Sequence, residues 1–121
     1  MTLLPLLRDR DEAGLAALLA DDVRFHSPVA DYAGRADVAH LFGLISGVLR
    51  KITPDREVGS WPHVTTFFSS GGLRGVLDER YDSSDHLVEA TLMLRPLSLL
   101  QQKIAEMGAA LRATPLPSAR P

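Results

Sequence analysis

The chain has 121 residues, of which 45% are hydrophobic, and a formal net charge of -2. This length suits a single domain with its own core, and the charge gives no general attraction to nucleic acid or to an anionic membrane. The absence of cysteine excludes disulfides and thiolate chemistry and fits a cytoplasmic protein. No apolar run approaches the ~18 residues of a membrane span, and the N-terminal stretch lacks signal-peptide features. The abundance of Ala, Leu and Arg is compatible with a bacterial source of high GC content.

The first half of the chain predicts a helix, a short strand and a second helix. Leucines at helical spacing indicate a helix over residues 11–20 that ends near residues 21–22. Residues 23–27 alternate between apolar and polar, as in a strand, and Pro28 ends that strand because proline cannot donate to a sheet. A continuous apolar stripe predicts a helix over residues 34–49.

The second half reads as a set of strands followed by a last helix. Two-residue alternation predicts strands over residues 56–60, 63–69, 73–81 and 87–95. Short turns between them imply antiparallel neighbours. An apolar stripe predicts a helix over residues 96–111, and we expect residues 112–121 to form a disordered tail. The fold class is therefore α+β: one domain over residues 1–111, with a curved antiparallel sheet, helices packed on one face, and a cone that could hold a small apolar ligand.

Four stretches carry a family resemblance. LLADDVRFHSPV followed by YAGRADVAHLF, GVLDERYDSSDHLVEATLMLRPL, and the overlapping MLRPLSLLQQKIAEMGAAL together cover most of residues 15–111. They resemble SnoaL-like proteins of the nuclear transport factor 2-like superfamily. The resemblance implies a cone-shaped, cystatin-like α+β barrel that is often a homodimer through its sheet. The superfamily includes polyketide cyclases, isomerases and dehydratases, and also binding and scaffolding proteins without known chemistry, so fold alone does not settle function.

The sequence departs from the family pattern in two places. Relatives often carry an acid directly after Gly-Val in the penultimate strand, where this chain has Leu77. Glu79 shares the strand face of Leu77 and is the nearest substitute. The family's long first helix is replaced by MTLLPLLRDR, which we expect to be broken at Pro5. Either the pocket is more open than in relatives, or this chain begins downstream of them.

Two residues are candidates for acid–base catalysis. His26 lies on the strand face opposite Phe25, and imidazole exchanges protons near neutral pH. Its alternative role is that of a partly exposed strand histidine with a structural hydrogen bond. Glu79 is the second candidate, and acid catalysis would require its carboxyl to be shielded from water. Its alternative role is that of a surface carboxylate.

Six further residues are candidates for ligand binding. They come from the loop after the first strand and from the later strands: Tyr32, Trp61, His63, Leu77, Met93 and Arg95. The aromatic side chains could instead cover the core or a dimer contact, and Arg95 could instead form a salt bridge at the strand–helix junction.

No histidine–carboxylate spacing suits a metal, and no nucleotide-binding motif occurs, so we expect no cofactor. The main hypothesis is that the protein binds an apolar or aromatic small molecule in its cone. If it is an enzyme, we expect cofactor-free cyclisation, isomerisation or dehydration. The alternative is a non-catalytic ligand-binding domain or a dimeric scaffold.

Overall fold

The computed structural model describes residues 2–120. Its helices are α1 (Leu3–Asp9), α2 (Glu12–Leu18), α3 (Arg35–Val48) and α4 (Leu97–Ala113), followed by the 3-10 turn η1 (Pro117–Ala119). Its strands are β1 (Leu19–His26), β2 (Asp31–Ala33), β3 (Ile52–Ser60), β4 (His63–Ser70), β5 (Leu73–Tyr81) and β6 (Leu87–Arg95).

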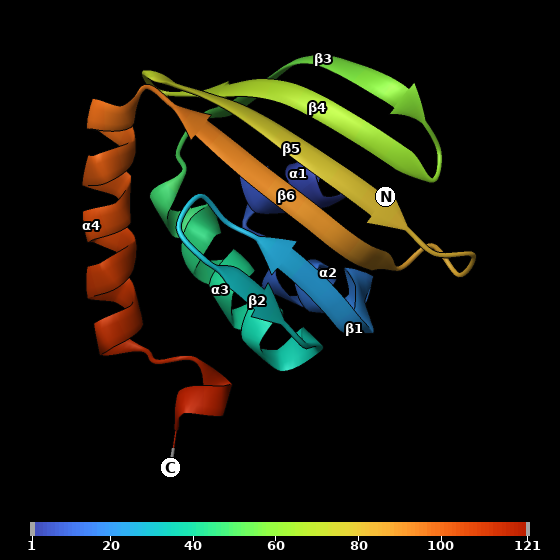
Figure 1. Ribbon diagram of the computed structural model, residues 1–121, viewed down its shortest axis with the longest axis horizontal. Coiled ribbons are helices and arrows are strands. Elements are labelled where there is room, and N and C mark those ends of the chain that lie inside the picture. Colours follow the sequence, from blue (N-terminus) through green and yellow to red (C-terminus); the bar gives the residue numbers. More distant parts are fainter. Residues whose placement is uncertain (1, 121) are drawn as a thin grey trace.

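The six strands form one curved sheet in the order β2-β1-β6-β5-β4-β3, and the sheet does not close into a barrel (Figure 1). All neighbouring strands are antiparallel except β1 and β6, which run parallel. The predicted antiparallel pairing is confirmed for the strands that short turns join, and the sheet differs from the prediction at this one pair. A parallel pair needs a long connection, and here β2, α3 and the whole β3–β5 meander lie between the two strands.

The inner face of the sheet is covered by α1, α2 and α3 (Figure 1). Along β5 every second residue is buried on this face, including Leu77, and in β6 Ala90 and Leu92 follow the same alternation. Phe25 on β1 meets Phe42 on α3 edge to face, with ring centroids 4.9 Å apart. Much of the predicted cone is thus filled by the protein's own side chains.

The N-terminal segment does not break at Pro5, contrary to the prediction. Pro5 lies in the first turn of α1, where the amide that proline lacks would have had no partner within the helix. The break falls at Arg10, which adopts a left-handed conformation with φ of 54°. Leucines of α1 are buried against the core, so α1 closes this end of the cone rather than leaving it open.

The C-terminal helix extends to Ala113, two residues beyond its predicted end. We expected disorder over residues 112–121, but within the described residues the chain after α4 folds back onto α3. The carbonyl of Thr114 lies 2.6 Å from Nε2 of His40. Asp37 in the first turn of α3 accepts hydrogen bonds from both the amide and the hydroxyl of Ser118. One contact therefore holds the end of α4 beside α3, and the other holds η1 there.

Gly75 lies directly beneath the ring of Phe68. The two residues lie opposite each other on β4 and β5, and the ring of Phe68 covers the glycine. A Cβ atom at position 75 would lie 2.4 Å from Cζ of Phe68. Because Phe68 is 1% exposed, its ring has no open space into which to move.

We therefore expect Gly75→Ala to lower the free energy of unfolding by about 1–3 kcal/mol, the usual cost of overpacking a core. Urea unfolding followed by circular dichroism measures the change. Gly43→Ala in α3 is the matched control, because a Cβ there would have no atom nearer than 3.8 Å. That variant should gain up to about 1 kcal/mol from helix propensity. Equal stability of the two variants would contradict the packing argument.

Candidate functional site

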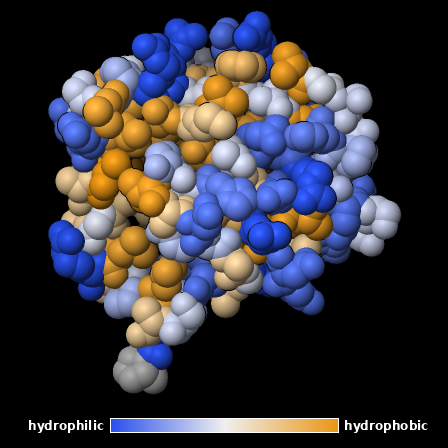
Figure 2. All heavy atoms as spheres, viewed as in Figure 1, coloured by the Kyte–Doolittle hydropathy of each residue, from blue (hydrophilic) through white to orange (hydrophobic). Residues whose placement is uncertain are grey.

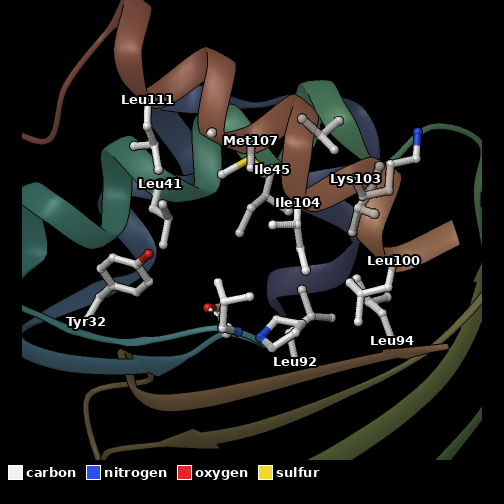
Figure 3. A pocket seen from close by; sticks show the side chains of 16 residues that line it. Tyr32, Leu41, Ile45, Leu92, Leu94, Leu100, Lys103, Ile104, Met107 and Leu111 are labelled. Atoms are coloured by element: carbon white, nitrogen blue, oxygen red, sulfur yellow. Dashed lines mark hydrogen bonds between the residues drawn. The ribbon is translucent and has the colours of Figure 1, made fainter. Parts of the chain in front are cut away.

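An apolar pocket lies between α3, α4, β6 and the turn from β1 to β2 (Figure 3). Its volume is about 180 Å³. Its walls are almost wholly apolar, and the lining residues are Ser27, Pro28, Val29, Tyr32, Leu41, Ile45, Val48, Leu49, Leu92, Leu94, Leu100, Lys103, Ile104, Met107, Gly108 and Leu111.

One side of the pocket is the apolar stripe of α4. Leu100, Ile104, Met107 and Leu111 recur at helical spacing and point towards the sheet and α3 (Figure 3). None of the residues of α4 is fully buried, so this helix covers the pocket without sealing it. Figure 2 shows hydrophobic residues gathered on the side of the molecule that α4 forms, and hydrophilic ones over the part of β5 and β6 that is farther from α4.

Tyr32 is the predicted residue that does line this pocket. The loop in which we expected it is the short strand β2, and register places Tyr32 opposite Phe25 of β1, with their rings stacked 6.4 Å apart. Figure 3 shows the hydroxyl end of Tyr32 pointing into the cavity towards Leu41. Lys103 contributes its aliphatic stem, while its ammonium lies at the outside, 3.4 Å from a carboxylate oxygen of Glu106.

Glu79 lies on the inner face as predicted but outside this pocket. Its Oε1 accepts hydrogen bonds from the amide of Leu3, at 2.7 Å, and from the hydroxyl of Tyr81, at 2.5 Å. The side chain is fully buried, and its Oε2 has no partner among the described residues. Burial therefore raises the pKa of the Glu79 carboxyl, while the hydrogen bonds from Tyr81 and Leu3 oppose the rise. The same burial, together with the carboxylate, raises the pKa of Tyr81.

The contact with Glu79 also anchors α1. The side chain of Thr2, at the start of α1, makes no capping hydrogen bond, and the carboxylate of Glu79 takes the first free amide instead. The candidate base is thus occupied in holding a helix against the sheet.

His26 lies on the outer face of the sheet, opposite to Glu79. Its Nδ1 is 2.8 Å from Asp31 on β2, and its Nε2 is 2.8 Å from Glu89 on β6. Only the doubly protonated imidazolium can donate to both carboxylates. The hydrogen bonds to Glu89 and then to Asp31 raise the pKa of His26. Arg80 and His26 in turn lower the pKa of Glu89 to about 2. The structure therefore does not bring His26 and Glu79 together in one site.

The remaining predicted ligand residues are also elsewhere. His63 pairs with Asp78 at 2.9 Å on the outer face, and Trp61 stacks on Tyr81 with ring centroids 4.5 Å apart. Leu77 is a core residue, 1% exposed. Met93 and Arg95 instead border a second, open hollow at one end of the sheet.

Sequence reasoning missed the pocket residues of α3 and α4. Their signal was present, since both helices carry the apolar stripes that were predicted, but a stripe by itself does not say whether it packs completely. Within residues 2–120, no group of three or more histidine or acidic side chains could hold a metal ion, and no helix is long and apolar enough to cross a membrane.

Comparison with known proteins identifies the family. No protein-family model matches the sequence, and neither does any curated protein. Among solved structures, a steroid delta-isomerase from Pseudomonas aeruginosa is 31% identical, with a TM-score of 0.80 over 90% of this chain and 85% of that one. A protein with a cystatin-like fold from Silicibacter pomeroyi is 22% identical, with a TM-score of 0.80 over 93% and 84% of the two chains. A SnoaL-like protein from Burkholderia thailandensis is 10% identical, with a TM-score of 0.66 over 77% and 88%.

The chain therefore belongs to the SnoaL-like proteins of the nuclear transport factor 2-like superfamily, as its sequence motifs indicate.

Ionisation of Glu79 should destabilise the fold. Because the pKa of Glu79 is raised in the folded state, stability falls as pH rises from the unfolded value, near ~4.3, through the folded value. Glu79→Gln cannot ionise and keeps an oxygen for Leu3 and Tyr81. We expect it to flatten this pH dependence and to exceed the wild type by on the order of 1 kcal/mol at about pH 8. Chemical unfolding across the pH range measures both quantities; a wild type that gains stability over this range relative to the variant would contradict the assignment.

The His26 network should also lose stabilisation as pH rises, because here the charged form is the one that the carboxylates stabilise. A raised folded pKa gives stabilisation that is complete below the unfolded value of ~6.5 and is lost as pH rises through the folded value. His26→Asn should therefore cost about 0.5–1 kcal/mol at about pH 6 and much less at about pH 9. Thermal unfolding at the two pH values measures this, with His86→Asn in the exposed turn as the control. A loss of equal size at both pH values would show that the charge of His26 is not involved.

Proposed function

We propose that the protein binds a small, largely apolar molecule in the pocket beneath α4, and that Tyr32 donates a hydrogen bond to an oxygen of that ligand. The observation that carries the proposal is the cavity of about 180 Å³ with apolar walls and one hydroxyl pointing inwards. Ligand sites in general combine apolar walls with a few placed polar groups.

The volume supports a ligand of about one ring or a short chain. An engineered apolar cavity of about 150 Å³ in another protein holds a single benzene. A four-ring skeleton, such as the substrate that the name of the Pseudomonas relative implies, would require α4 to move away from α3.

Binding without catalysis is the function that the pocket geometry supports best. Proton transfer requires an acid or base within hydrogen-bond reach of the substrate. No carboxylate or imidazole lines the pocket and the ammonium of Lys103 lies at the outside, which leaves the hydroxyl of Tyr32 as the polar group that points inwards. Glu79 already accepts hydrogen bonds from Leu3 and Tyr81, and His26 lies on the other face of the sheet.

A proton-transfer reaction is the second candidate. The buried Glu79–Tyr81 pair and the 31% identity to a steroid delta-isomerase favour it. Its test is incubation with a β,γ-unsaturated ketosteroid, whose conversion to the conjugated enone is visible by ultraviolet absorbance. Turnover by the wild type that is lost in Glu79→Gln would establish catalysis, and no turnover would leave binding as the function.

A matched pair of probes tests the binding proposal: ethylbenzene, and acetophenone, which adds a carbonyl oxygen to a similar skeleton. We expect both to shift the methyl NMR signal of Met107, which lies in the pocket. Tyr32→Phe should weaken acetophenone binding about 5–10-fold, the loss of one hydrogen bond, and leave ethylbenzene unchanged.

Gly108→Leu gives an independent control. Gly108 lines the pocket from α4, and a Cβ there meets only the flexible end of Arg112, at 3.4 Å. The larger side chain should fill the cavity and abolish binding of both probes without loss of stability, since leucine favours helix over glycine. Probes that still bind to this variant would place the ligand outside the pocket.

A further inference from the structure

The outer face of the sheet has two halves that differ in charge balance. In one half most of the charged groups are paired: Glu89 contacts both His26, at 2.8 Å, and Arg80, at 2.9 Å. Asp78 contacts His63 at 2.9 Å. His26, His63 and Arg80 thus each have a carboxylate within hydrogen-bond distance, whereas the exposed Arg24 on β1 forms no ion pair with any of residues 2–120.

The other half carries arginines that lack such partners. Arg74 on β5 and Arg95 on β6 lie directly opposite each other in the antiparallel register. Like charges in that position repel and destabilise a strand pair. The carboxylate paired with Arg74 is Asp55, at 3.8 Å, and both of those side chains are largely exposed. Arg95 forms no ion pair with any of residues 2–120. An external anion would relieve this repulsion.

Apolar side chains lie beside these two arginines. At the next position on the same face of the sheet, Phe67, Val76 and Met93 follow one another across β4, β5 and β6. Met93 is 61% exposed, and the guanidinium of Arg56 lies 4.2 Å from the centre of the Phe67 ring. Together with Arg74 and Arg95 these three side chains border a hollow of about 490 Å³ on the outer face.

We propose that this hollow is a second binding site, for a small organic anion with a flat apolar body. The carboxylate, sulfonate or phosphate group of the ligand is held by the guanidinium groups of Arg74 and Arg95, whose planar donors match such oxygens. The apolar body lies on Phe67, Val76 and Met93, of which the flexible thioether of Met93 adapts to an irregular surface. This site is independent of the pocket beneath α4, because the two share only Leu94.

The test uses the two internal methionines as reporters, since Met93 borders the hollow and Met107 lines the pocket beneath α4. The full chain is labelled at its methionine methyl groups and titrated with anilinonaphthalene sulfonate, an aromatic anion, and with phenylnaphthylamine, the same skeleton without the sulfonate. Met93→Leu and Met107→Leu assign the signals. We expect the sulfonate to shift the Met93 signal, to bind at least about 5-fold more tightly than the uncharged probe, and to weaken with added salt.

Substitution of the two arginines tests whether binding of the sulfonate requires their charge. Arg74→Gln and Arg95→Gln should each raise the dissociation constant of the sulfonate probe about 5-fold or more. Arg8→Gln, which removes one exposed arginine from α1, should leave it unchanged. Because this dye also binds partly unfolded protein, an unchanged Met107 signal in each variant serves as the folding control.

Four results would overturn the proposal. The first two are that the sulfonate dye does not bind, or that it shifts the Met107 signal instead of the Met93 signal. The other two are that the dye binds the arginine variants as tightly as the wild type, or that the charged and uncharged probes bind with equal affinity. Sedimentation analysis adds a fifth: a dimer that covers Met93 and excludes the dye would assign this face to a second copy of the chain. If ethylbenzene does not shift the Met107 signal, the function proposed for the pocket beneath α4 is wrong, but the site on the outer face is not affected. The two proposals can therefore be overturned independently of each other.

Discussion

The two-residue period of the strands decides where each chemically interesting side chain of this protein lies. Glu79 and Asp78 are neighbours in sequence, yet one is fully buried under α1 and the other pairs with a histidine on the outer face. The same alternation separates Phe25 from His26 on β1. Any reaction that used His26 and Glu79 together would have to act through the sheet, so the sheet itself divides the candidate residues into two independent groups.

The filling of the cone follows from how α1 is held. Four leucines of α1 are buried in the core, and its first amide is bonded to Glu79. The helix thereby occupies space that a ligand would need in order to approach the carboxyl group. The free volume lies instead at the other end of the inner face, where α4 leans on α3 and β6 with no fully buried residue of its own. A helix packed in this way is the element of the fold that a ligand could displace at least cost.

Much of the fold could be predicted from alternation and turn chemistry alone. The bounds of β5 and β6 are confirmed, because turns rich in Gly, Ser and Asp precede and follow β5, and Pro96 ends β6. β3 begins at Ile52, before its predicted start, since Pro54 is tolerated in an edge strand with a bulge. The parallel pairing of β1 with β6 could not be predicted, because strand order depends on contacts that are distant in sequence.

The site was less predictable than the fold, for a physical reason. Site residues such as His26 and Glu79 were predicted from the chemistry of their side chains. The pocket, in contrast, arises from incomplete packing between two apolar stripes, and packing is a property of the assembled molecule. Glu79 illustrates the difference. Its position on the inner face follows from alternation, but its role depends on Leu3, 76 positions away in sequence. An acid can thus keep a place compatible with catalysis while its contacts make it a structural anchor, which is why membership of a family that contains isomerases does not by itself assign this chain a reaction.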